Sequence, residues 1–500
     1  MQIICISRGS QSNGEDFAKN LAAKLDYECI SREYLLEEAT RRRIPIGKLE
    51  TSIIKPHLFT DKLAHELEHY KALATSILCE KALNGNLIYH GRTGHLLLPG
   101  ISHILKLRVV ADTECRIKSI MEKMKLPREK AKQYIEQIDE DRKKWVKTFY
   151  NTQWDVFTQY DFIVNMSFMN INNVSTALCS MAQLPEFQST PSSINALKDL
   201  YLESQARLVL FSDRRTNTFN IRVKANDGRI NVTYPALLAE KIDIIDESLR
   251  NLADVKEIIY TKAQANILWI QEQFNVNDGS YEKVLSVANN WDAAIELLKI
   301  KPDDTEELIN SAIEDQENAP ETWRDTGIIA EGEDIHCDSS KDMAKIHEKL
   351  IKDGRAGGQK TIIGSRKSLI NSIDKTANYK LIIFDNIFFS MGELSRKRLI
   401  REWSNSLSDI LTSPVVTLHE LEYRYQFKTK NWIQLIVNGL LTFLIVILVF
   451  SFSTPILEFL SMKGTSMRII ATICILVFGP IFAIIYSTVI GLLLKLIKFE

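Results

Sequence analysis

The sequence predicts an α/β protein with parallel sheets flanked by helices, followed by an apolar C-terminal segment. Strand-like and helix-like patterns alternate over residues 1–184, beginning with IICIS and FAKNLAAKL, and alternate again over residues 323–420. Such alternation is typical of parallel sheets with crossover helices. Near the C-terminus, residues 432–452 and 469–494 are almost wholly apolar, and each run has the roughly 20 residues that a membrane-spanning helix needs.

Several domains are expected, because 500 residues are too many for one ordinary hydrophobic core. A Pro/Ser-rich stretch, QLPEFQSTPSS, ends the first α/β region. After it come a helical pattern and two alternating runs around Asp227-Gly228, a favourable hairpin turn. The predicted boundaries are 1–184 and 323–420 for the α/β domains, 196–272 for a small α+β domain, 273–322 for a helical acidic linker, and 431–497 for a transmembrane helical hairpin.

Composition excludes some classes of function. The chain has 62 basic and 63 acidic residues, so its overall charge gives no reason to expect a nucleic-acid partner. Its seven cysteines are scattered without a C-x-x-C pair, which indicates buried thiols in a reducing compartment. The N-terminus has no basic segment before its short apolar run, so no signal peptide is predicted.

The distribution of basic residues predicts how the C-terminal runs lie in a membrane. Basic residues lie mainly outside the two runs, at Arg424, Lys428, Lys430, Lys495 and Lys498, with only Lys463 and Arg468 between them. By the positive-inside rule, both termini and the soluble domains are expected in the cytoplasm, with two spans and an external loop. Pro480 within the second run is tolerable as a kink. The alternative is a buried helical hairpin in a soluble core.

The first strand leads into a loop with the layout of a phosphate-binding turn. Gly9 and Gly14 have the spacing of G-x-x-x-x-G-K-[ST], and a helix follows. Such a turn offers free backbone N–H groups and a positive helix dipole to an anion. However, Glu15 occupies the lysine position and Asp16 the Ser/Thr position, where a cation and a magnesium-binding hydroxyl are normally needed. Taken alone, the segment is also compatible with a purely structural turn.

A longer series of motifs runs in order over about 180 residues. It comprises IICISRGSQSNGEDFAKNLAAKL, NLIYHGR, LRVVA, the arginine-bearing helix with D-x-x-R, Trp154-Asp155, and YDFIVN. This series resembles the cytidylate kinase-like family, a branch of the P-loop nucleoside monophosphate kinases. The resemblance implies a P-loop kinase-like parallel sheet, ATP with Mg²⁺, and phosphate transfer to CMP or a related acceptor.

The resemblance also implies roles for particular residues. The anion loop comprises Ser7, Arg8, Ser12, Asn13 and Gly14. Arg92 closes the strand that faces the phosphates, and Arg108, Arg116, Arg128, Arg142 and Asp139 lie on or near mobile lid helices. Arg92, Arg116 and Arg142 are the expected catalytic residues, because phosphoryl transfer depends on positioning and charge neutralisation. For any single arginine, the alternative is a solvated helix face.

The sequence departs from the family pattern at the loop itself. The family's G-S-G-G followed by Arg is replaced by Gln11-Ser12-Asn13-Gly14 followed by Glu15, and an aspartate near the acceptor is replaced by Ser31. By this interpretation Arg8 is the only cation left near the loop. Two function classes therefore stay open: an active phosphotransferase, and a degenerate nucleotide-binding sensor or membrane scaffold.

The segment HELEH, residues 65–69, matches the H-E-x-x-H pattern of zinc proteases. His65 and His69 would face the same side of a helix. Glu68 adds a charge where such helices are usually apolar, and no third ligand follows at a recognisable spacing. A solvated helix is the favoured interpretation, and no metal site is predicted.

Two further modules follow the kinase-like region. Residues 196–272 resemble a BON domain, a small αββαβ module associated with membranes, through IRVKANDGRINV and LADVKEI. In residues 323–420, Gly364-Ser365 and Asp385 lie at strand ends, where α/β folds bind ligands, although a docking domain is the alternative. The expected partners are a nucleotide, a membrane through the hairpin, and a protein partner through residues 196–420.

Overall fold

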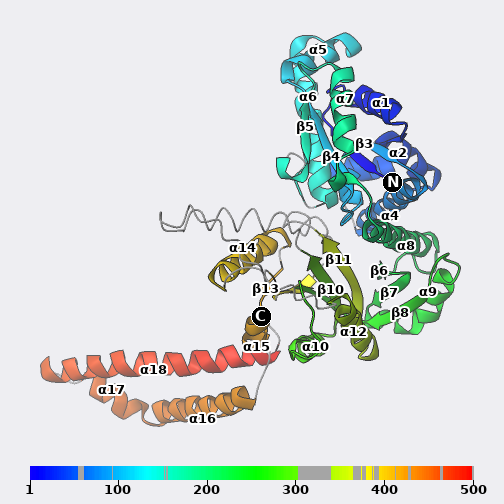
Figure 1. The fold of residues 1–500 in the computed structure, drawn as a ribbon. Helices are drawn as coiled ribbons and strands as arrows, with labels where there is room; N and C mark the ends of the chain where they lie inside the picture. Colours follow the sequence, from blue (N-terminus) through cyan, green and yellow to red (C-terminus); the bar gives the residue numbers. More distant parts are fainter. Residues whose placement is uncertain are drawn as a thin grey trace, which may run out of the picture. The chain divides into compact units, whose positions relative to one another are not determined.

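The computed structural model describes residues 1–54, 61–92, 94–150, 152–153, 156–301, 339–363, 373, 379–385, 387, 393–411, 413–425, 429–461 and 465–497. The chain divides into two compact units, Met1–Val416 and Thr417–Glu500 (Figure 1).

The first sheet has five parallel strands in the order β2-β3-β1-β4-β5. The strands are β1 (Ile3–Arg8), β2 (Glu28–Ser31), β3 (Leu87–Gly91), β4 (Ile104–Val110) and β5 (Phe162–Asn165). The helices are α1 (Gly14–Leu25), α2 (Arg32–Arg41), α3 (Ile46–Ile54), α4 (Asp61–Asn84), α5 (Thr113–Met124), α6 (Arg128–Tyr150) and α7 (Ile171–Ala182), with short 3₁₀ turns η2 (Gly94–Leu97), η3 (Phe157–Gln159) and η4 (Pro185–Phe187).

Both faces of the first sheet are covered, as its continuous apolar strands predict. Ile3 and Cys5 belong to a core shared with α4, whereas Ile4 and Ile6 belong to a second core with Phe17 of α1. Alternate side chains of the central strand therefore fill opposite layers. The α/β architecture predicted for this region is confirmed.

Helix α8 (Pro191–Ser212) joins the first sheet to the next part of the fold. Thr190 and Ser193 form a reciprocal capping box at its N-terminus. Leu197 and Leu208 are buried in the core that contains α4, while Leu202 and Leu210 belong to a different core with the strands that follow. A single helix thus closes two hydrophobic cores.

A three-stranded sheet follows in the order β6-β7-β8. Its elements are β6 (Arg222–Asn226), β7 (Arg229–Tyr234), η5 (Ala236–Lys241), α9 (Ile242–Leu249) and β8 (Glu257–Lys262). β6 and β7 are antiparallel, and the turn between them has positive φ at Asp227 (49°) and Gly228 (77°), which confirms the predicted hairpin. From α8 onward the element order is helix, strand, strand, helix, strand.

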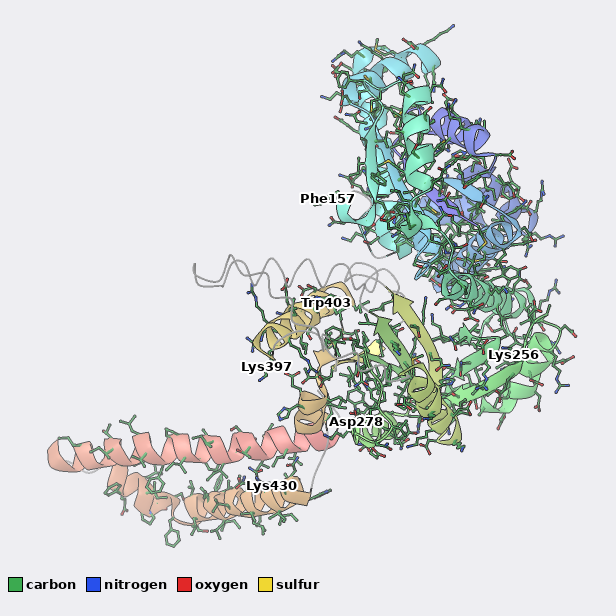
Figure 2. The ribbon with its side chains drawn as sticks, viewed as in Figure 1. Phe157, Lys256, Asp278, Lys397, Trp403 and Lys430 are labelled. Carbon is green, nitrogen blue, oxygen red and sulfur yellow. The ribbon has the colours of Figure 1, made fainter. Side chains whose placement is uncertain are left out.

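A second parallel sheet has the order β11-β10-β9-β12-β13. It comprises β9 (Ala265–Gln271), β10 (Ala293–Lys301), β11 (Ala356–Ile363), β12 (Tyr379–Phe384) and β13 (Val415–Val416), with helices α10 (Ser280–Trp291), α12 (Ser339–Lys352) and α14 (Glu393–Leu411). Trp403 of α14, labelled in Figure 2, stacks on Phe384 of β12 at a ring distance of 5.9 Å.

The structure corrects two predictions in this region. Residues 273–322 were predicted to be helical, but α10 is followed by the strand β10, and residues 302–322 lie outside the described part. β9 was grouped with residues 196–272, but it pairs with β10 and β12. Both strands are buried on two faces, so they lack the polar–apolar alternation that reveals a half-exposed strand. The first part of the α/β region predicted over residues 323–420, up to residue 338, lies outside the described residues.

The second unit contains α15 (Leu418–Tyr425), α16 (Thr429–Ser451), α17 (Ser453–Ser461) and α18 (Thr465–Ile497). Within α16 and α18, Lys430–Ser451 and Leu476–Leu493 are long and apolar enough to cross a membrane, by length and composition. α18 includes Pro480. The tight loop predicted between the runs instead contains α17, whose Pro455 lies in the first turn, where proline is compatible with a helix.

The first prediction tests the shared role of α8. Leu197 is fully buried, and replacing it with Ala should destabilise the first domain by about 2–5 kcal/mol, because a cavity would open between α4 and α8. The loss of stability is measured by thermal unfolding of the full chain in detergent, followed by amide hydrogen exchange in β1 and α4. Lys198→Ala on the exposed face of α8 is the matched control. Equal protection in both variants would show that α8 does not belong to this core.

Candidate functional site

The loop after β1 is a tight turn that opens onto the N-terminus of α1. Gln11 and Asn13 adopt left-handed φ values of 55° and 56°. A Cβ on Gly14 would lie 2.6 Å from the Arg8 Cβ, so only glycine fits there. The Ser12 hydroxyl donates to the Gly9 carbonyl at 3.0 Å. Asn13 makes no side-chain hydrogen bond that caps α1, so the first-turn amides face the loop as an anion site would require.

Glu15, at the lysine position of the loop, is held by two cations. Its carboxylate accepts from Lys19 Nζ at 2.8 Å and pairs with Arg8 at 3.4 Å. The Lys19 hydrogen bond is the main cause that lowers the pKa of Glu15. Arg8 also makes two 2.9 Å hydrogen bonds to the carboxylate of Glu33 on α2. The loop thus carries a carboxylate that competes with any phosphate for Arg8.

Helices α5 and α6 contact the loop through a polar network. Arg116 pairs with Asp139 at 2.7 Å and donates from Nε to the Ser10 carbonyl at 2.8 Å. The Ser10 hydroxyl in turn donates to Asp139 at 3.0 Å. Arg142 donates to the Arg8 carbonyl at 2.9 Å. The sequence had left Arg8 as the only cation near the loop, which is wrong, since Lys19, Arg116 and Arg142 also surround it.

Two partly buried arginines at this site lack a carboxylate partner among the described residues. Neither Arg92, just after β3, nor Arg142 on α6 forms an ion pair with a described carboxylate, and the buried Nε of Arg142 has no hydrogen-bond acceptor. Burial, with Arg32 and Arg142 adding repulsion, lowers the pKa of Arg92 to about 9. Burial likewise lowers the pKa of Arg142 to about 10, although Asp139 opposes the shift. Both changes mean that the site favours an added negative charge.

Trp145 of α6 positions two guanidinium groups. Arg92 lies 5.5 Å from its ring centroid and Arg32 lies 5.6 Å from it, so both contact one indole ring. Arg32 also pairs with Glu50 of α3. Trp145 stacks on Phe149 with ring centroids 5.0 Å apart, which fixes the indole against the core. The aromatic pair therefore serves as a rigid support for the arginine cluster.

Ser7 and Arg108 meet on the other side of the loop through Tyr160. The Tyr160 hydroxyl donates to the Ser7 hydroxyl at 3.2 Å, and the Arg108 guanidinium lies 5.5 Å from the Tyr160 ring centroid. Ser7 is almost completely buried. These contacts brace the end of β1 and place Arg108 beside the loop.

One predicted site residue lies apart from the cluster. Arg128, at the start of α6, is 56% exposed and pairs with Glu114 on α5. Residues 154–155, which the family resemblance included, lie outside the described residues. The other predicted residues gather around the loop: Ser7, Arg8, Ser12, Asn13, Gly14, Arg92, Arg108, Arg116, Asp139 and Arg142.

Sequence reasoning missed several residues that complete the site. They are Lys19, Arg32, Glu33, Glu50 and Trp145. Arg32 directly follows Ser31, whose hydroxyl accepts from the Tyr34 amide and caps α2, so a closer look at that segment could have found it. Glu50 and Trp145 gave no signal, because a charged residue and an aromatic on amphipathic helices are ordinary.

The H-E-x-x-H histidines pack against α8. The Phe211 ring contacts His65 edge-on at 4.7 Å and stacks on His69 at 5.3 Å. His69 also approaches Glu66 at 3.7 Å. Among the described residues, no group of three or more His, Cys, Asp or Glu side chains could hold a metal ion. The pair thus contributes aromatic packing to the α4–α8 contact.

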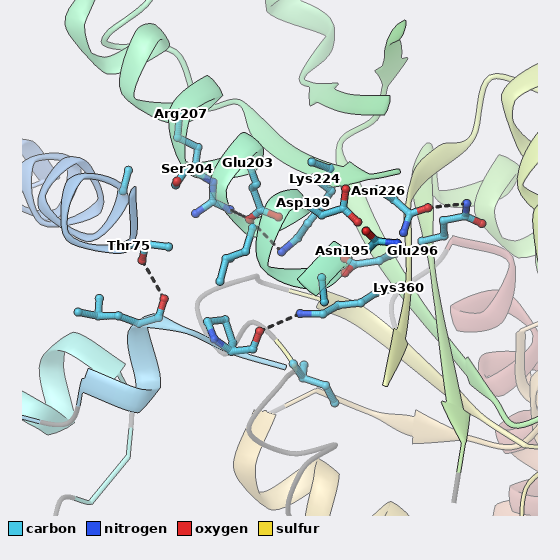
Figure 3. Close-up of a pocket in the computed structure, with 18 of the residues that line it drawn as sticks. Thr75, Asn195, Asp199, Glu203, Ser204, Arg207, Lys224, Asn226, Glu296 and Lys360 are labelled. Atoms are coloured by element: carbon cyan, nitrogen blue, oxygen red, sulfur yellow. Dashed lines mark hydrogen bonds and ion pairs between the residues drawn. The ribbon is translucent and has the colours of Figure 1, made fainter. Parts of the chain in front are cut away.

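A separate cavity of about 700 Å³ lies where α4, α8, β6 and β11 meet (Figure 3). Glu203 in its wall pairs with Arg207 at 3.1 Å and Lys224 at 3.4 Å, and Asn226 accepts from Gln359 at 2.9 Å. Lys360 of β11 donates to the Pro99 carbonyl at 3.1 Å. These contacts tie the three sheets together, and they connect β11 to the segment that follows Arg92.

Comparison with known proteins agrees with the geometry of the first domain. Residues 3–168 match the cytidylate kinase-like family. No curated protein matches the chain at a significant level.

The solved structures similar to this domain include kinases. An uncharacterized protein from Eubacterium ventriosum shares 17% identity, with 36% of this chain and 98% of that chain covered and a TM-score of 0.29. Shikimate kinase from Acinetobacter baumannii, in complex with shikimate, shares 9% identity, with 36% of this chain and 92% of that chain covered and a TM-score of 0.22. Dephospho-CoA kinase from Campylobacter jejuni shares 14% identity, with 36% of this chain and 97% of that chain covered and a TM-score of 0.21.

Proposed function

We propose that the first domain binds a nucleotide by its phosphate, with Arg92 and Arg142 as the principal anchors. The observation that carries this proposal is the pair of partly buried guanidinium groups that form no ion pair with a carboxylate of the described residues. Arg8, Arg32 and Arg116 each have an acidic partner, in Glu33, Glu50 and Asp139. Two unmatched positive charges suit one phosphomonoester dianion, which arginines bind through paired charge-assisted hydrogen bonds.

The family match supports a nucleoside monophosphate such as CMP as the phosphate acceptor and ATP as the donor. In that reaction the loop of Ser7, Arg8, Ser12, Asn13 and Gly14 holds the donor phosphates with its backbone amides. Arg92, Arg116 and Arg142 neutralise the charge of the transferred group, which is the main task in phosphoryl transfer. Arg108 and Asp139 hold the surrounding elements, and Arg128 would act only if α5 and α6 moved.

The loop does not offer an ordinary site for the Mg²⁺ that accompanies ATP. Asp16, at the position of the usual Ser/Thr hydroxyl, is exposed in the first turn of α1. The described residues contain no cluster of metal-ligating side chains. We therefore assign no step of the reaction to a protein-bound metal.

A second candidate function is nucleotide binding without turnover, as in a membrane-associated sensor. The ion pairs of Glu15 with Lys19 and Arg8 favour it, because they place a carboxylate where a catalytic lysine normally contacts the phosphates. These ion pairs weaken the binding of the donor phosphates by the loop, but they do not involve the arginines on the acceptor side.

The apolar helices α16 and α18 support membrane anchoring with two spans. The distribution of basic residues around the two apolar runs supports a topology with both termini and the soluble domains in the cytoplasm. The helix–strand–strand–helix–strand order from α8 to β8 supports a BON-like module, and residues 196–420 are the proposed region for a protein partner.

The second prediction tests the phosphate anchor. Replacing Arg92 with Ala should weaken binding of CMP or a related monophosphate at least tenfold, about 1.4 kcal/mol, because a buried charge-assisted hydrogen bond is lost. Calorimetric titration of the full chain in detergent measures the affinity. Arg128→Ala, which removes an exposed arginine paired with Glu114, is the matched control. Equal losses in both variants would mean that the arginine cluster does not hold the phosphate.

The third prediction separates the two candidate functions. Glu15→Lys should tighten ATP binding about tenfold, since close unit charges near a protein surface interact by about 4 kcal/mol before screening by solvent. Glu15→Gln, which only removes the negative charge, should have a smaller effect. Phosphate transfer to CMP should rise with Glu15→Lys only if the acceptor side is competent. Unchanged ATP affinity would show that the loop does not contact phosphate.

The fourth prediction concerns orientation in the membrane. A cysteine at Gly464, between the apolar runs, should react with an impermeant thiol reagent in intact cells. A cysteine at Lys428, before the first run, should react only after lysis. The reverse pattern would place the soluble domains outside the cytoplasm.

A further inference from the structure

The second parallel sheet carries a row of polar residues at its carboxyl edge. Lys299 of β10 is paired in register with Gln271 of β9 and with Thr361 of β11. Asp385 follows Phe384, which is paired with Ile270, so it extends the same row on the β12 side. The row crosses four neighbouring strands, and on β9, β10 and β12 the preceding residue is apolar. It is separate from the loop and arginines of the first domain.

Two members of this row are buried to an unusual degree. Gln271 is fully buried and Lys299 is 2% exposed. Neither Nε2 nor Oε1 of Gln271 has a hydrogen-bond partner. A buried amide that makes no hydrogen bond is unfavourable for the folded chain, and a ligand that hydrogen-bonds to Gln271 would remove that penalty.

The row faces the layer of α10 and α12. Ile270, Leu298 and Phe384 point into the core that contains Trp403 of α14. Because side chains alternate along a strand, Gln271, Lys299 and Asp385 point to the opposite face. The connections through α10 and α12 run from β9 to β10 to β11, whereas β12 lies on the other side of β9. The strand order therefore reverses between β9 and β12, and open α/β sheets bind ligands at such a switch point.

Helix α10 begins at this same edge of the sheet. Its N-cap is Gly279, in a left-handed conformation with φ of 72° and without a side-chain cap. The Asp278 side chain accepts from the Ser280 amide at 2.9 Å, which leaves the next amides of the first turn to another acceptor. Phe274 of the connecting loop packs edge-on against Trp269 at 5.3 Å and fixes the loop on the sheet. The positive end of α10 and the Lys299 ammonium both favour an anion.

From these observations we infer a second ligand site, at the β9–β12 switch point, for a phosphate monoester of a small polyol such as a phosphorylated ribose. The phosphate is bound by the first-turn amides of α10 and by Lys299. The Gln271 amide, which can donate and accept, binds a hydroxyl of the ligand, and Asp385 accepts from another hydroxyl. The carboxylate of Asp385 disfavours a ligand that is only anionic, which is why hydroxyl groups are part of the proposal. This site does not depend on the function proposed for the first domain.

The experiment uses the full chain in detergent with Arg92→Ala and Arg142→Ala together, so that both proposed phosphate anchors of the first domain are removed. Ribose 5-phosphate, AMP and inorganic phosphate are titrated separately by calorimetry. Saturable binding of ribose 5-phosphate, with inorganic phosphate at least tenfold weaker, is the expected result. AMP binding as tight as ribose 5-phosphate would identify the natural ligand as a nucleotide, and much weaker AMP binding would identify it as a sugar phosphate. Failure of both esters to bind, or equally tight binding of inorganic phosphate, would overturn the proposal.

Gln271→Leu provides the decisive variant. Because it removes an unsatisfied buried amide, it should maintain or raise the thermal midpoint of the free chain, yet weaken ribose 5-phosphate binding at least tenfold. Asn231→Leu is the matched control, since Asn231 is also a buried amide without a partner but lies inside β7. Ribose 5-phosphate should also slow hydrogen exchange at the amides of residues 281–282 in the unsubstituted chain. Unchanged affinity in Gln271→Leu, or unchanged exchange at α10 under saturating ester, would contradict the site.

Discussion

The pairing of β1 with both β3 and β4 is the constraint on which the first domain depends. It aligns Ser7 with Gly91 on one side and with Arg108 on the other. Because the strands are parallel, their carboxyl ends meet at one edge, and the loop after Arg8 emerges beside Arg92. Burial of β1 on both faces prevents a shift of register, since a shift by one residue would turn its side chains to the wrong layers. The candidate site is therefore fixed by the sheet before any polar contact is made.

The electrostatics of the site follow from how its charges are paired. Arg8, Arg32 and Arg116 have carboxylate partners. These pairs destabilise the fold little, because each positive charge is compensated by a negative one. Arg92 and Arg142 repel one another in a partly buried setting, which the fold tolerates by placing Arg92 on Trp145 and by giving Arg142 a backbone carbonyl. Such residual repulsion is characteristic of functional sites. Glu15 has the opposite effect, because its carboxylate occupies Arg8 and Lys19 on the donor side of the loop.

The rest of the first unit is connected to this site through packing. α8 contributes to the cores of both the first domain and the three-stranded sheet. The Lys360 contact with the Pro99 carbonyl joins β11 to the segment between β3 and β4. A change in the second parallel sheet could therefore reach the segment that follows Arg92 through few contacts. These contacts join the two α/β domains of the first unit by packing and by a direct hydrogen bond.

The sequence by itself determined the α/β character of residues 1–184, the Asp227-Gly228 hairpin and the two long apolar helices, because each depends on local periodicity or turn chemistry. It also pointed to residues that the structure brings together around the loop, since these lie within a recognisable order of motifs. Only the tertiary structure decided that β9 and β10 belong to one sheet, because strands buried on both faces carry no alternating pattern. The tertiary structure also decided which charges are paired. Glu33, Glu50 and Trp145 are distant in sequence from the loop, and only folding brings them to it, so the unmatched charge of Arg92 and Arg142 could not be predicted from the sequence.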